Sequence, residues 1–167
     1  MGSCQNNQTW WFQCIRGGEP DLQNWLLSGW VDVVLSYAPA PRVGRVVQAV
    51  TPEHLVLYSD RPDSPIAYDS GYVFVDYGEM YRRQHGEAYY DAGTAKISFD
   101  SPVRAHEYVI ERGGSAYLPS YIATADIAAG RLFALTKASV FHREVFAISQ
   151  QATAQKWPWF ASLIGRL

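Results

Sequence analysis

The chain has 167 residues, of which 48% are hydrophobic and 18% are charged, and its formal net charge at pH 7 is -2. This length suits one domain, or two small lobes that share a sheet, and the composition excludes an intrinsically disordered protein. The slightly acidic charge argues against nucleic-acid binding by this chain alone, because phosphate contacts require an excess of Lys and Arg.

The cysteines and the first residues indicate the compartment. Cys4 and Cys14 are too few for a disulfide framework and have no partners at metal-ligand spacing. The N-terminal residues contain no apolar signal core, and no apolar run approaches the roughly 18 residues of a membrane span. We therefore expect a cytoplasmic protein without a metal site.

The first part of the chain alternates strand, helix and strand. Residues 10–15 are apolar and aromatic and end at Gly17-Gly18, which is typical of a buried strand before a turn. A helix is predicted next, because Pro20 suits a first helical turn and Gly29 suits a C-terminal cap. The nearly continuous apolar run 31–37 predicts a parallel strand covered on both faces.

The rest of the chain continues this pattern, which is that of an α/β protein. Further strands are predicted over 45–50, 54–58, 72–75, 97–99, 115–118, 132–135 and 144–149. Helices are predicted over 79–89, 102–112 and 120–129, followed by a final helix that carries Phe160, Leu163, Ile164 and Leu167. The best helix start is Ser101-Pro102, a capping side chain followed by proline.

Four stretches in chain order carry a resemblance to a known family. They are residues 26–35 (LLSGWVDVVL), 54–58 (HLVLY), 113–119 (GGSAYLP) and 130–132 (GRL). Each motif alone is common, but the ordered set spans nearly the whole chain and resembles the effector-binding domain of LysR-type transcriptional regulators. Residues 72–78 (YVFVDYG), with 82–85 (RRQH) after them, are similar to a subgroup of that family that has tryptophan at the position of Tyr77.

The resemblance implies a type II periplasmic-binding-protein-like α/β fold, with two lobes joined by two crossing strands and a small molecule held in the cleft. By that analogy, lobe one comprises residues 1–50 and 139–167, and lobe two comprises 51–138. The match opens at the family's second strand, without the helix-turn-helix or the first strand and helix of lobe one. We therefore expect a fragment, a truncated gene product or a domain that has re-paired its sheet.

Candidate ligand-binding residues lie where strands run into helices. Helix N-termini offer unpaired N–H groups to carboxylates. Open α/β sheets bind ligands at the edge where strands run into helices. Each turn alone is equally well explained as an ordinary connection between a strand and a helix. Arg16 is a candidate partner of a ligand carboxylate, or a solvated surface group. The predicted ligand-binding residues are Gly17, Gly18, Ser36, Tyr37, Tyr77, Gly78, Ser101 and Ser115.

Catalytic motifs are incomplete. His106-Glu107 begins like a zinc-protease helix, but Ile110 stands where the second histidine is required. Ser115 lacks the following glycine of a nucleophile elbow, and no phosphate-binding glycine loop occurs. We therefore predict a non-enzymatic domain that uses no cofactor and binds a small organic effector, such as a carboxylate.

The expected assembly is a homodimer that does not bind DNA directly, with residues 10–12 (WWF) at or near the interface. Removal of a central strand would leave an unpaired sheet edge, and such edges invite pairing with another chain. The alternative is a stand-alone binding or interaction module that pairs with another chain without catalysis. A third and weaker hypothesis is a small α/β enzyme.

Overall fold

The computed structural model describes residues 13–67, 69–90 and 95–156. In chain order its elements are α1 (Glu19–Ser28), β1 (Val33–Ser36), β2 (Arg45–Ser59), β3 (Tyr72–Val75), α2 (Glu79–Ala88), β4 (Ile97–Phe99), α3 (Pro102–Arg112), β5 (Ser115–Pro119), α4 (Ser120–Ala128), β6 (Phe133–Ala134), β7 (Phe141–Gln150) and α5 (Gln151–Lys156). None of the helices within these residues is long and apolar enough to cross a membrane.

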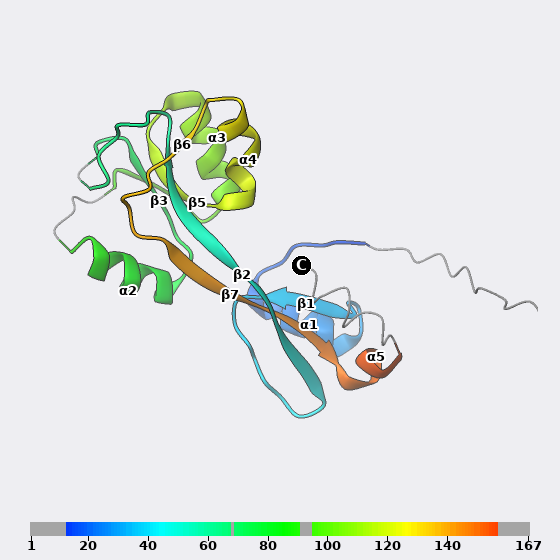
Figure 1. Cartoon of the computed structure of the whole chain (residues 1–167). Helices are drawn as coiled ribbons and strands as arrows, with labels where there is room; N and C mark the ends of the chain where they lie inside the picture. The colour runs from blue at the N-terminus through cyan, green and yellow to red at the C-terminus, as the bar shows by residue number, and fades with distance from the viewer. Residues whose placement is uncertain (1–12, 68, 91–94, 157–167) are drawn as a thin grey trace, which may run out of the picture.

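One mixed seven-stranded sheet connects the molecule, and the α/β prediction is confirmed. The strand order is β1-β7-β2-β5-β3-β4, with β6 pairing to β2. β3 is parallel to β4 and β5, whereas β7 is antiparallel to both β1 and β2. The two long strands β2 and β7 run from the part that holds α1, β1 and α5 to the part that holds α2, α3 and α4 (Figure 1). The predicted lobe boundaries stay a prediction.

Several local predictions are confirmed in detail. Gly29 closes α1 in the left-handed region, with φ of 73°. The Ser101 hydroxyl accepts a hydrogen bond from the backbone N–H of Arg104, so that Ser101 caps α3 directly before Pro102. Gly113 ends that helix with φ of 77°. These residues specify their turns locally, and their positions could therefore be predicted without tertiary information.

Three strand predictions are wrong. β1 pairs antiparallel with β7, and Leu35 is 52% exposed, so β1 is not a parallel strand covered on both faces. Residues 45–50 and 54–58 belong to one strand, β2, with a register shift between Val50 and Glu53. The shift accommodates Pro52, because a bulge tolerates a residue without an N–H donor. Residues 13–15 form no strand.

Two further predictions fall at the chain ends. Residues 10–12 lie outside the described residues, as do Phe160, Leu163, Ile164 and Leu167 of the predicted final helix. Within the described residues, the short helix α5 follows β7 directly.

The core divides into three clusters along the sheet. Leu26, Val34 and Ile148 pack α1 against β1 and β7. The strand β5 is buried throughout and alternates between the other two clusters: Ala116 and Leu118 join one, and Tyr117 joins the other. This alternation follows from the two-residue side-chain period of a strand that is covered on both faces.

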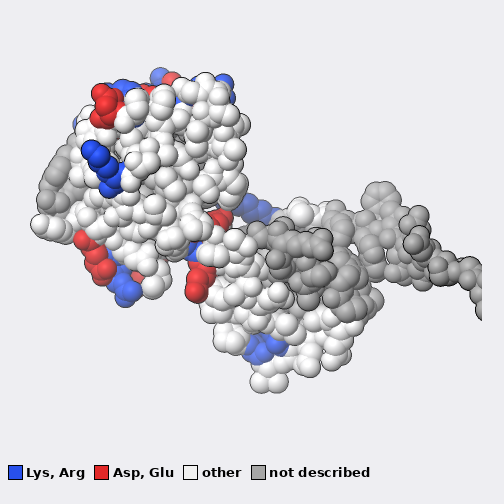
Figure 2. All heavy atoms as spheres, viewed as in Figure 1, with Lys and Arg blue, Asp and Glu red and all other residues white. Residues whose placement is uncertain are grey.

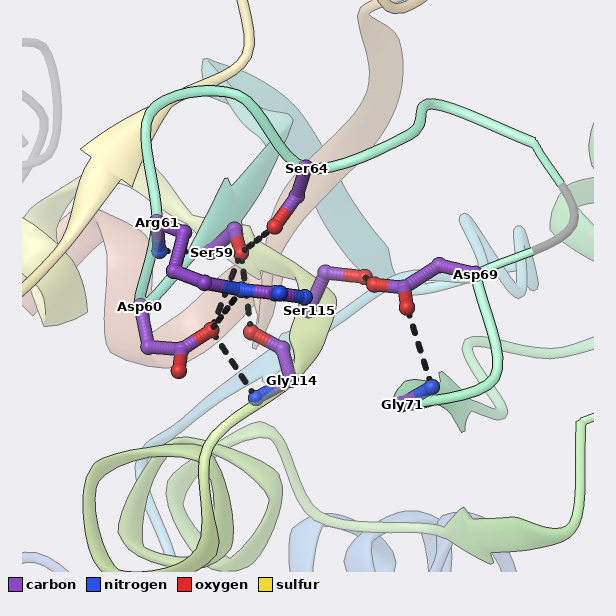
Figure 3. A network of polar contacts seen from close by, with 8 residues as sticks. All are labelled: Ser59, Asp60, Arg61, Ser64, Asp69, Gly71, Gly114 and Ser115. Carbon is purple, nitrogen blue, oxygen red and sulfur yellow. Dashed lines mark hydrogen bonds and ion pairs between the residues drawn. The ribbon is translucent and has the colours of Figure 1, made fainter.

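A buried polar network lies at the first residue of β5 (Figure 3). The Ser59 hydroxyl is 2.6 Å from that of Ser64 and donates to the carbonyl of Gly114. The Ser115 hydroxyl donates to Asp69 Oδ2 at 2.9 Å. These contacts satisfy otherwise orphaned polar groups and fix the loop between β2 and β3.

Candidate ligand-binding cleft

A cavity of about 960 Å³ lies beside β1 and reaches the opposite part of the molecule. The segment 13–17 and residues 30–37 form one wall. The other wall includes Tyr77, which follows β3, Val103 of α3 and Tyr121 of α4. Acidic and basic side chains gather at the narrow junction between the two parts, while most of the visible face is uncharged (Figure 2).

The structure brings together half of the predicted ligand-binding residues. Those that line the cavity are Gly17, Ser36, Tyr37 and Tyr77; those outside its lining are Gly18, Gly78, Ser101 and Ser115. Three of the outer four are chain neighbours of lining residues, but Ser115 is not. It starts β5, whereas the cavity lies near the end of that strand, where α4 begins.

The hydroxyls of the three serines predicted to bind a ligand already have protein partners. Ser36 is buried, donates to Glu19 Oε2 at 2.9 Å and accepts from the backbone N–H of Ala38. Ser101 caps α3, and Ser115 holds Asp69. These hydroxyls hold helix starts and loops in place, and their role as hydrogen-bond partners of a ligand stays a prediction.

Sequence analysis missed the charged pair at the base of the cleft. Glu53 on β2 and Arg143 on β7 are register partners at the bulge, and Nη2 of the arginine lies 3.2 Å from Oε2 of the glutamate. Both side chains are mostly buried, at 15% and 14% exposed. No signal in a single sequence links two residues so far apart, because their meeting depends on the β2–β7 register.

Three tyrosines complete this group, which we call the cleft cluster: Tyr37, Glu53, Tyr77, Tyr121 and Arg143. The guanidinium carbon lies over two rings, 3.4 Å from the centroid of Tyr37 and 4.6 Å from that of Tyr77. The hydroxyls of Tyr37 and Tyr121 donate to Glu53 Oε1 at 3.0 and 3.3 Å. The cluster thus joins residues that follow β1 and β3, a residue of α4, and the two long strands.

The environment keeps the phenols protonated. Burial raises the pKa of Tyr37 to about 12, although the charge of Arg143 partly opposes the shift. Burial likewise raises the pKa of Tyr77, with the same opposing charge. The pKa of Tyr121 is raised by burial first and by Glu53 second. All three hydroxyls are therefore hydrogen-bond donors at neutral pH.

An aromatic cluster supports the cleft from the side of α2. Tyr81 and His85 of this helix pack with Tyr117 and Phe141, and Tyr72 Oη lies 2.9 Å from His85 Nε2. Burial lowers the pKa of His85, because it disfavours the charged imidazolium.

This shift predicts acid sensitivity. Because the folded-state pKa of His85 lies below its unfolded value of 6.5, its contribution to stability is complete above pH 6.5 and is lost as pH falls through the folded value. Urea unfolding at a series of pH values should therefore show a falling free energy of unfolding on acidification, and His85→Gln should flatten that fall. An equally steep fall in the variant would assign the effect to another group.

No protein-family model and no curated protein matches this sequence. Solved structures match its fold. The regulatory domain of HypT from Salmonella typhimurium, in its apo form, is 15% identical with a TM-score of 0.70, and the match covers 89% of this chain and 80% of that one. The CrgA regulatory domain, from a LysR-type transcriptional regulator of Neisseria meningitidis, is 12% identical with a TM-score of 0.63 over 86% and 78% of the two chains.

A full-length regulator gives the same result. LysG from Corynebacterium glutamicum, with bound effector Arg, is 14% identical with a TM-score of 0.64 over 90% of this chain and 55% of that one. The chain therefore has the fold of LysR regulatory domains, and the fold that the sequence resemblance implied is confirmed.

Proposed function

We propose that this chain is a small-molecule sensing domain, equivalent to the effector-binding portion of a LysR-type transcriptional regulator. The observation that carries the proposal is the cavity beside the cleft cluster, which draws its walls from both parts of the molecule. The effector bound to LysG supports the idea that this fold serves ligand recognition. The proposed domain is non-catalytic and acts in the cytoplasm.

The proposed ligand is a small organic molecule with a flat apolar part and a polar or carboxylate group. Tyr37 and Tyr121 expose 54% and 65% of their surface, and both line the cavity beside Tyr77. Such a cavity gains affinity from aromatic area and specificity from a few fixed polar groups.

Ligand binding would act on the relative positions of the two parts. Tyr37 follows β1, Tyr77 follows β3, and Arg143 lies on the strand β7 that runs between them. A ligand that contacts these residues better in one arrangement than in another shifts the population toward that arrangement.

Native mass spectrometry of the untreated, freshly purified protein tests this proposal. We expect a fraction of the protein to carry a small molecule that dissociates on collisional activation, and Tyr77→Ala to lower that fraction about tenfold, since a stacked ring contributes on the order of 1 kcal/mol or more. Tyr90→Ala is the matched control, because Tyr90 is 85% exposed and does not line the cavity. Equal occupancy in both variants would place the ligand elsewhere.

A second proposal concerns pairing with another chain, which the alternative of an interaction module requires. Among the residues that the structure describes, β1 is the terminal strand of the sheet and is paired to β7 alone. Leu35 on this strand and Trp30 before it are 52% and 63% exposed. An open strand edge with apolar neighbours favours pairing with another chain, and we propose a homodimer.

Light scattering at high micromolar concentration should give twice the mass of the 18.8 kDa chain. The substitution Leu35→Lys should shift the protein toward monomer, because a charge on an edge strand opposes edge pairing. Leu35 also lines the cavity, so this variant tests the mass of the protein and not its ligand occupancy. A parent protein that is monomeric at this concentration would refute the dimer and leave the sensing proposal intact.

A further inference from the structure

We infer that Arg143 anchors a single carboxylate group of the ligand, and that the cleft selects monocarboxylates over neutral amides and dicarboxylates. This inference rests on the proposed sensing function, because it names the chemical class that the same cleft would bind. It goes beyond the residues predicted from the sequence, since the anchor lies on β7 and not at a helix start.

Arg143 has unused hydrogen-bonding capacity. A guanidinium carries five N–H donors. Nη2 approaches Glu53 at 3.2 Å, but this ion pair lacks hydrogen-bond geometry, and Nε is buried without a partner among the described residues. A buried N–H donor without an acceptor costs free energy. A ligand acceptor that reaches this donor therefore stabilises the complex more than a contact at the surface would. Carboxylate oxygens match the planar fork of arginine and bind it bidentately.

Glu53 fills that role only in part, because its Oε2 lies 3.2 Å from Nη2 without forming a hydrogen bond, while its other oxygen is turned to the tyrosines. Oε1 receives hydrogen bonds from both Tyr37 and Tyr121. Arg143 lines the cavity, whereas Glu53 is not among the lining residues. A ligand that enters the cleft therefore meets the guanidinium and the rings that flank it, with the glutamate behind them.

The charge of the cavity lining limits the ligand to one negative group. Within the described part of the chain, two basic and three acidic residues line it: Arg16, Arg143, Glu19, Asp32 and Asp100. A carboxylate at Arg143 is favourable, but a second carboxylate elsewhere in the cavity would face this acidic excess in a partly desolvated site. Like charges in such a site repel strongly.

Titration with three matched probes tests the inference: benzoate, benzamide and terephthalate, followed by NMR through the ring signals of Tyr37 and Tyr77. We expect benzoate to bind about tenfold more tightly than benzamide or terephthalate, which is the difference that one charge-assisted hydrogen-bond pair supplies. The signals of the cleft tyrosines should move, and those of Tyr90 should not.

Two conservative variants separate an anchoring role from a structural one. Arg143→Lys keeps the positive charge but loses the planar pair of N–H donors that binds a carboxylate bidentately. Benzoate affinity should therefore fall about fivefold while benzamide affinity stays unchanged. Glu53→Gln retains the acceptor for the two phenols and frees the guanidinium charge, so benzoate affinity should rise. Arg61→Gln, at an exposed loop position remote from the cavity, is the control.

The outcomes of these titrations distinguish failure of the carboxylate inference from failure of the sensing function. If benzamide moves the cleft signals as strongly as benzoate, the carboxylate inference is wrong and the sensing function stands. If Arg143→Lys and Glu53→Gln weaken all three probes equally, Arg143 has a purely structural role. If no probe moves the cleft signals at millimolar concentration and the purified protein carries no ligand, the sensing function fails as well.

Discussion

Replacement of Gly114 by alanine is expected to lower the free energy of unfolding by about 2 to 6 kcal/mol, since backbone strain and overpacking each cost about 1 to 3 kcal/mol. Gly114 has φ of 110°, in a region that L side chains rarely adopt, and a Cβ at this position would overlap the carbonyl oxygen of Gly71. That carbonyl cannot move freely, because it accepts the backbone N–H of Ser115. The surrounding loop is also held by Ser59 and Asp60 (Figure 3).

Gly130→Ala is the matched control, to be measured by urea unfolding under the same conditions. Gly130 also has a positive φ, of 67°, but apart from its own atoms and its two chain neighbours no atom of the described residues lies within 4 Å of the place that a Cβ would take. The control should therefore cost only the left-handed backbone term, about 1 kcal/mol. Equal losses in the two variants would mean that the approach of Gly114 to Gly71 carries no energetic weight.

Truncation of Tyr117 to alanine is expected to lower the free energy of unfolding by about 3 to 5 kcal/mol, the range for large aromatic residues in a core. The ring is 1% exposed and lies 4.9 Å, between centroids, from Phe141. Its hydroxyl donates to the carbonyl of Ser139 at 2.9 Å and lies 2.5 Å from the hydroxyl of Tyr89. Thermal and urea unfolding should both register the loss.

Two comparisons isolate the cause of this loss. Tyr117→Phe keeps the ring and should cost only about 1 kcal/mol for the hydrogen bonds. Tyr90→Ala removes a tyrosine that is 85% exposed, and it should change stability by no more than about 0.5 kcal/mol. If Tyr117→Phe costs as much as Tyr117→Ala, the hydroxyl network and not ring packing holds this core together.

Tyr77 connects that core to the cleft. Its hydroxyl donates to the main-chain carbonyl of Tyr117 at 2.8 Å, and its ring packs edge-on against Tyr81 at a centroid distance of 5.0 Å. One side of the ring thus belongs to a rigid core while another faces Arg143 and the cavity. A residue held in this way can orient a ligand without losing side-chain entropy on binding.

Much of the local structure follows from contacts between near neighbours in the sequence. Helix starts and ends such as Ser101 and Gly29 could be predicted because a cap is a contact between near neighbours in the chain. The fold of LysR regulatory domains could also be predicted, because its motifs occur in a fixed order along the chain. The sequence also indicated that Tyr37 and Tyr77 lie near one cavity, because both follow strands that end beside it.

The strand partners and the centre of the candidate site depend on contacts between segments that are far apart in the sequence. The apolar run 31–37 does not reveal that β1 pairs antiparallel with β7, since the same composition suits a strand covered on both faces. Glu53 and Arg143 each stand in ordinary strand sequence, and their meeting depends on the β2–β7 register at the bulge. Register is a property of two segments together, because it is fixed by which faces both bury, and neither segment specifies it alone.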